Sequence, residues 1–133
     1  MAATDRFGLK SVTGELSDAR FRQSNISFDQ SARIWTLVCW SPRRGRSAVC
    51  TEWWQELRFT VSNVVTYKSS FTEKVDYYEI ASLSLSEDKT QLQILCHYGA
   101  DLRLTIGQLD VQLLQGSGEG KRGGRQKGSW VDS

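Results

Sequence analysis

The stretch ISFDQSARIWTLVC at residues 26–39 matches LSLSEDKTQLQILC at residues 83–96 position for position, at a constant offset of 57. Further along, ELRFTVSNVV at 56–65 matches DLRLTIGQLD at 101–110 at an offset of 45. The offset falls because residues 40–55 connect the two blocks in the first copy, where the second copy uses only four residues. Loops tolerate such insertions. We therefore interpret the chain as an internal duplication of one β unit.

Both copies have the residue period of β-strands. LRFTV at 57–61 and LRLTI at 102–106 alternate apolar with small or polar residues, so one face of each strand is predicted to be buried and the other wet. The mainly polar segments 29–32 and 86–89 separate apolar runs, which predicts a hairpin in each copy.

Two segments, 34–40 and, less fully, 92–96, are apolar on both faces, which is typical of central strands covered on each side or of strands in a closed barrel. Residues 62–63 and 107–108 fit either a two-residue turn into a fourth strand or a bulge that bends one long strand. No long helical period is present. The sequence thus predicts an all-β fold, or a β-dominated α+β fold, of six to eight antiparallel strands, with the duplicated units forming a small sandwich or barrel.

The 133 residues are long enough for one core, so we predict a single duplicated β domain over 16–115, with halves at about 18–70 and 75–115. Residues 1–15 are predicted to be flexible by position and composition. Residues 116–133 form a Gly/Lys/Arg-rich tail that is predicted to be disordered.

No membrane-length apolar stretch and no apolar N-terminal run is found, so we expect a soluble, cytoplasmic protein with no membrane partner. The odd number of cysteines argues against a disulfide framework. One histidine and three scattered cysteines lack the spacing of a metal site, and no glycine-rich phosphate loop precedes a helix. No metal and no small-molecule cofactor is therefore expected.

Enzymatic activity has one candidate pair. Cys50, in the predicted long loop, and His97, the single histidine, would form a thiol nucleophile and base if the loop folded over the short turn. No motif supports this arrangement, so we predict no catalytic residue and no enzyme.

The distribution of charged residues raises the question of a nucleic-acid partner. The chain has 17 basic and 15 acidic residues, and the tail accounts for the excess, which leaves 13 of each in residues 1–115. Arginines near tryptophans in the long loop and in the tail would suit phosphates and unstacked bases. The alternative is that they solvate a loop beside Glu52 and Glu56, since a neutral domain lacks the broad basic footprint of nucleic-acid-binding proteins. The candidates for this secondary function are Arg43, Arg44, Arg46, Arg122 and Arg125.

Adjacent aromatic residues are the candidates for a protein interface. In the pairs Trp53/Trp54 and Tyr77/Tyr78, strand geometry should leave one member on the outer face. Exposed Trp and Tyr favour protein interfaces. The alternatives are that both members are buried in a sandwich, or that aromatic residues at the edge only shield the sheet. Open sheet edges would also permit a partner strand or self-association.

The hairpin ISFDQSARIWTL, followed by LRFTVSNV, resembles stretches in small uncharacterised bacterial β-rich proteins, some of them near immunity-type proteins. The resemblance covers residues 18–67. It implies a compact, non-enzymatic domain and transfers no functional residue.

Together these observations predict a non-catalytic protein-interaction module, immunity-like or homo-oligomeric. A nucleic-acid-binding accessory protein is the first alternative and a Cys/His thiol enzyme the second.

Overall fold

The structure is a computed structural model. It describes the backbone of residues 1–44, 52–121 and 130–132, and the side chains of residues 1–43 and 54–116. In chain order the elements are β1 (Ala2–Ala3), α1 (Arg6–Leu16), β2 (Arg20–Phe21), a 3-10 helix (Gln23–Asn25), β3 (Ile26–Asp29), β4 (Ile34–Arg44), β5 (Glu52–Val61), β6 (Val64–Phe71), β7 (Tyr78–Leu85), β8 (Gln91–His97), β9 (Ala100–Ile106), β10 (Val111–Lys121) and β11 (Trp130–Asp132).

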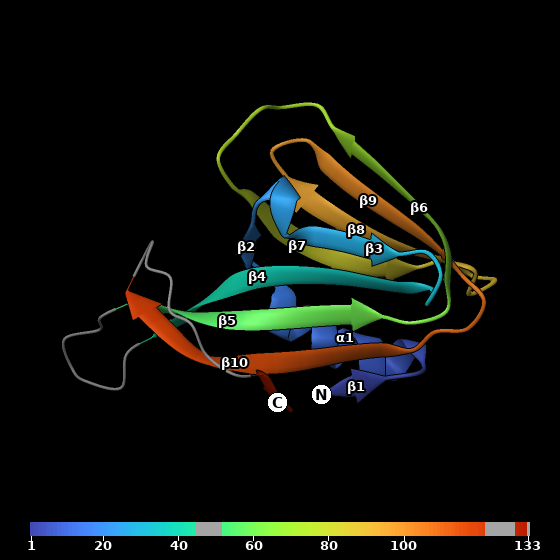
Figure 1. The fold of residues 1–133 in the computed structure, drawn as a ribbon, viewed down its shortest axis with the longest axis horizontal. Helices are drawn as coiled ribbons and strands as arrows, with labels where there is room; N and C mark the ends of the chain where they lie inside the picture. The colour runs from blue at the N-terminus through green and yellow to red at the C-terminus, as the bar shows by residue number, and fades with distance from the viewer. Residues whose placement is uncertain (45–51, 122–129, 133) are drawn as a thin grey trace.

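The described strands form one antiparallel sheet in the order β1-β10-β5-β4-β2-β7-β8-β9-β6, with β3 paired to β4 and β11 paired to β10. The sheet is not closed, since its end strands β1 and β6 do not pair with each other. Eight of these strands have four or more residues, which confirms the predicted β-dominated class. Figure 1 shows β4, β5 and β10 side by side, with β6, β9 and β8 sloping above them.

Each copy of the repeat folds as a three-stranded meander, β3-β4-β5 and β7-β8-β9. The first hairpins have equivalent registers. Trp35 lies opposite Phe28, and Leu92, at the offset of 57, lies opposite Leu85. This agreement is what a duplicated unit would give, and the duplication itself stays a prediction.

The fourth strand of each copy crosses to the other copy. β6, which follows β5, pairs with β9, while β10, which follows β9, pairs with β5. The residues that the sequence left open as turns or bulges, 62–63 and 107–108, are thus corners between strands of different halves. The corners are hydrogen-bonded to each other: Ser62 N–H donates to the Asp110 carbonyl (2.9 Å) and Gly107 N–H to the Asn63 carbonyl (2.9 Å).

The exchanged strands enclose one core. Alternate residues of β5, β9 and β10 are fully or almost fully buried, as the period-two pattern predicted. Trp35 and Phe59 meet edge to face with ring centroids 6.2 Å apart. The two segments predicted to be apolar on both faces lie in β4 and β8, which are interior strands of the sheet.

Helix α1 corrects the expectation that residues 1–15 are flexible. Asp5 begins the helix, its side chain accepting a hydrogen bond from the Gly8 N–H at 2.7 Å. Leu9, Val12 and Leu16 lie on one face and are buried in the core. The helix contacts β1 and β7, and Figure 1 shows it lying behind β5.

The predicted boundary at residue 116 also shifts. β10 continues to Lys121, and β11 pairs with it from Leu114 to Gly116. The other tail residues, 122–129 and 133, lie outside the described residues, so their disorder stays a prediction.

Candidate functional site

The four aromatic residues predicted as partner contacts lie in different surroundings. Tyr77 is 37% exposed, whereas Tyr78 is 4% and Trp54 is 7% exposed. Trp53 belongs to β5, and its side chain lies outside the described part of the chain. Burial therefore removes Trp54 and Tyr78 from the candidate surface, and Tyr77 remains.

Tyr78 is buried because its ring packs against other aromatic rings of the core. Its ring lies 5.0 Å from that of Phe71 and 5.9 Å from that of Phe21, centroid to centroid. Its hydroxyl donates to the Glu73 carbonyl at 2.7 Å, which satisfies the polar end of the side chain.

Tyr77 borders a shallow hollow of about 210 Å³ that we call the tyrosine hollow. Three of the seven large hydrophobic side chains that are exposed among the described residues line it: Val75 (38%), Tyr77 (37%) and Tyr98 (48%). The complete lining is Arg20, Val75, Asp76, Tyr77, Glu79 and Tyr98.

Two arginines hold the walls of the tyrosine hollow. The Arg22 guanidinium donates to the Tyr77 hydroxyl (2.8 Å) and lies 4.7 Å from the centre of its ring. Arg20 Nε donates to Glu79 Oε1 at 2.9 Å, and its guanidinium lies 4.9 Å from the centre of the Trp54 ring. The Tyr77 hydroxyl and the Glu79 carboxylate are therefore each held by an arginine.

Tyr98 reaches the hollow through a tight turn between β8 and β9. Tyr98 and Gly99 both have positive φ, 67° and 78°, which is the conformation of a two-residue hairpin loop with the twist of the flanking strands. A bulky residue is uncommon in this conformation. At position 99 the Cβ of any other residue would meet Thr72 Oγ1, so glycine is required there.

The tyrosine hollow carries an excess of negative charge. Its lining has two carboxylates and one guanidinium, and Arg20 is already paired with Glu79. Asp76 has no ion pair among the described residues. A positively charged group placed in the hollow would thus be attracted by Asp76.

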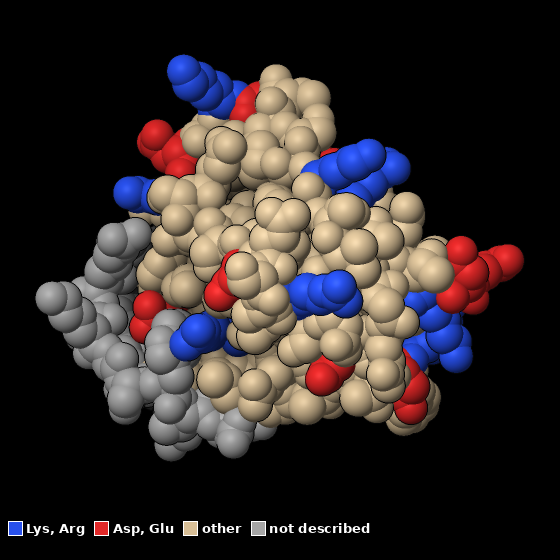
Figure 2. Space-filling view, turned by 45° about the vertical axis from the view of Figure 1, so that its right-hand side comes forward, with Lys and Arg blue, Asp and Glu red and all other residues tan. Residues whose placement is uncertain are grey.

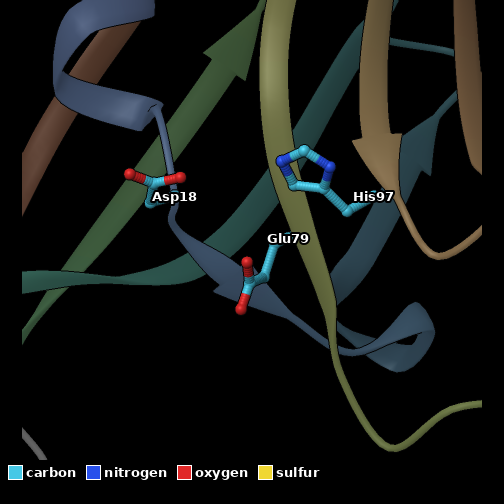
Figure 3. A group of neighbouring side chains, drawn as sticks. All are labelled: Asp18, Glu79 and His97. Carbon is cyan, nitrogen blue, oxygen red and sulfur yellow. The ribbon is translucent and has the colours of Figure 1, made fainter.

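Beside the hollow, Asp18, Glu79 and His97 bring a ligand atom each to within 4.8 Å of the others. Asp18 follows α1, Glu79 is in β7 and His97 ends β8 (Figure 3). Glu79 and His97 are direct cross-strand partners, so their side chains share a face of the sheet. Asp18 is held against β7 because its N–H donates to the Ile80 carbonyl at 2.9 Å.

The arginines predicted to bind nucleic acid do not assemble into a described basic patch. Arg43 is paired with Glu15 (2.8 Å). Arg44 lies at the end of β4, and its side chain is not described. On the face drawn in Figure 2, basic and acidic side chains are interspersed. Arg46, Arg122 and Arg125 lie outside the described residues, so their role stays a prediction.

The described thiols are poor nucleophiles. Burial, with a smaller contribution from Glu56, raises the pKa of Cys39 far above its usual range. Burial and the negative charge of Asp101 raise the pKa of Cys96 to about 12. Both are therefore protonated at neutral pH. Cys50, the thiol of the predicted Cys/His pair, lies outside the described residues, and His97 lies beside Asp18 and Glu79.

A second hollow, of about 650 Å³, lies at the β3–β4 hairpin. Its lining is mostly polar, and Ile34 (37% exposed) is its one exposed large hydrophobic residue. It therefore offers fewer of the residue types that dominate protein interfaces than the tyrosine hollow does.

Sequence reasoning missed Val75, Tyr98, Asp18 and Glu79. The dipeptide Tyr98-Gly99 between two strand patterns was the available signal, since a short loop of this type exposes its first residue. No sequence signal joins Asp18, Glu79 and His97, because they come from three segments that meet through strand pairing.

Comparison of the chain with protein-family models, curated proteins and solved structures finds no match. Among the described residues, no helix has both the length and the apolar character needed to span a membrane.

Proposed function

We propose that this chain is a non-catalytic protein-interaction module and that the tyrosine hollow receives a basic side chain of a protein partner. The observation that carries the proposal is the gathering of Val75, Tyr77 and Tyr98 around one hollow that contains Asp76. Tyrosine and arginine are the residue types in which binding energy concentrates at protein interfaces.

The chemistry of the hollow favours a long basic side chain. The aliphatic stem of a lysine or arginine would pack on Val75 and the Tyr98 ring, while its charged end would approach Asp76. A cation near the face of Tyr98 would also be attracted by the ring. The hydrogen-bonded Arg22–Tyr77 pair would form one wall of the contact.

The test begins by placing a photo-crosslinking phenylalanine analogue at position 98 of the full chain. Cells of the source organism are irradiated, and the crosslinked protein is identified and purified. Its affinity is then measured by titration calorimetry with the unmodified chain and with variants.

We expect Tyr77→Ala, Tyr98→Asn and Asp76→Asn each to weaken that binary complex about tenfold or more, the size of an interface hot spot. Asparagine tolerates the positive φ at position 98, so that variant should keep the turn. Val65→Ala is the matched control and should leave the affinity unchanged. Val65 is 46% exposed and lies near the start of β6, whereas Val75, Asp76 and Tyr77 of the tyrosine hollow follow the end of that strand. The proposal would be refuted if the three hollow variants bound the partner as tightly as the Val65→Ala control does. It would also be refuted if no partner were crosslinked through position 98.

A further inference from the structure

We infer that Asp18, Glu79 and His97 form a binding site for one divalent zinc ion on the surface beside the tyrosine hollow. The sequence predicted no metal site, because its one histidine and three cysteines lack the spacing of metal ligands. Asp18, Glu79 and His97 are 61 and 18 positions apart along the chain. The fold brings them together, with one oxygen or nitrogen atom from each within 4.8 Å of the other two.

The donor set suits zinc. Zinc accepts imidazole nitrogen and carboxylate oxygen at about 2.0–2.2 Å, which places tetrahedral ligand atoms roughly 3.4 Å apart. Asp18 and His97 are exposed, so a small change of side-chain torsion can close the remaining distance. Three protein ligands leave a fourth position for water.

The imidazole separates this trio from an ordinary group of surface carboxylates. Carboxylates alone are typical of hard cations such as magnesium and calcium, whereas imidazole favours zinc and its neighbours. Within the described residues, the Asp18 carboxylate and the His97 ring nitrogens have neither a hydrogen bond nor an ion pair, so both are available to a metal.

Glu79 is the ligand that is already fixed. Its Oε1 accepts from Arg20 Nε at 2.9 Å, and a carboxylate has a second oxygen that can bind a cation. The Arg20 charge opposes the metal, but Asp18 and Glu79 together exceed it by one negative charge. Backbone pairing holds Glu79 opposite His97, so two of the three ligands share the β7–β8 hairpin (Figure 3).

The experiment uses the full chain with Cys50→Ser, stripped of metal by a chelator and titrated with zinc chloride by calorimetry. Removing this thiol prevents zinc binding at Cys50 from obscuring the result. We expect one zinc ion per chain, and heteronuclear NMR of the same samples should show the His97 ring signals shifting on zinc addition.

His97→Ala and Asp18→Asn should each weaken zinc binding at least about tenfold, since loss of even a supporting residue costs 10- to 100-fold. Asparagine fits the positive φ of 68° at position 18, so Asp18→Asn preserves the backbone if His97→Ala perturbs the hairpin. Asp76→Asn, in the adjoining hollow, is the matched control and should bind zinc as the parent does.

The inference is overturned if the parent chain shows no zinc binding, or if both ligand variants bind as tightly as the parent. It does not rest on the proposed function. Zinc is measured without any partner, and the partner experiment depends on Tyr77 and Tyr98, which are not zinc ligands.

Discussion

Cys96 has a thiol whose ionisation is controlled by its position on β8. It is partly buried, and its pKa is raised to about 12 because burial disfavours the thiolate and Asp101 adds a negative charge nearby. In the unfolded chain the same thiol ionises near its ordinary pKa of 9.0. The folded state therefore retains a proton that the unfolded state releases.

We accordingly expect Cys96 to make the free energy of unfolding decrease as the pH rises from about 9 toward 12. A group with a raised pKa in the folded state contributes its full stability below the unfolded pKa, and that stability is lost as the pH rises through the folded pKa. Urea unfolding under reducing conditions at a series of pH values measures the slope. Cys96→Ser removes the titrating group, so its stability should decline less steeply, and identical slopes would contradict the assignment.

At the scale of a single element, α1 shows how tertiary packing determines whether a segment forms a helix. Its sequence contains Gly8 and Gly14 and few apolar residues, and such a helix would be marginal in isolation. Leu9, Val12 and Leu16 nevertheless share one face and are buried. Tertiary burial, which no local pattern reports, stabilises the helix.

We expect Leu16→Ala to lower the free energy of unfolding by about 2–5 kcal/mol, because a fully buried leucine leaves a cavity when truncated. Phe7→Ala is the control on the same helix. Phe7 is 82% exposed, so its removal should change stability by less than about 0.5 kcal/mol. Urea unfolding followed by circular dichroism compares the two. Similar small effects for both would show that residues 1–15 are flexible after all.

The strands were predictable where the helix was not. Alternation in 57–61 and 102–106 places Leu57 and Leu104 inside, and both are fully buried. The orientation of the Tyr77/Tyr78 pair was half predictable. The strand period requires that Tyr77 and Tyr78 face opposite ways, but which one faces the core depends on Phe21 and Phe71, which come from other strands.

At the scale of the whole molecule, the two meanders are joined by exchanging their fourth strands. The repeat in the sequence predicted two similar units, yet it could not show that β6 leaves its own unit to pair with β9. The positive φ of Asn63 would also suit a hairpin turn between β5 and β6. A corner forms there instead because β6 pairs with β9 and β5 pairs with β10.

The same distant pairing explains why the candidate zinc ligands were not predicted. β2 aligns Arg20 with Glu79, and β7 aligns Glu79 with His97. Each contact joins residues from separate parts of the chain. A function based on this surface therefore depends on the assembled sheet.

Nuclear Overhauser contacts between backbone protons of the labelled full chain test the strand exchange most directly. The described pairing predicts contacts between Phe59 and Leu113, on β5 and β10, and between Tyr67 and Leu104, on β6 and β9. Contacts between Phe59 and Thr66 instead would show β5 and β6 forming an ordinary hairpin, and would contradict the exchange of fourth strands.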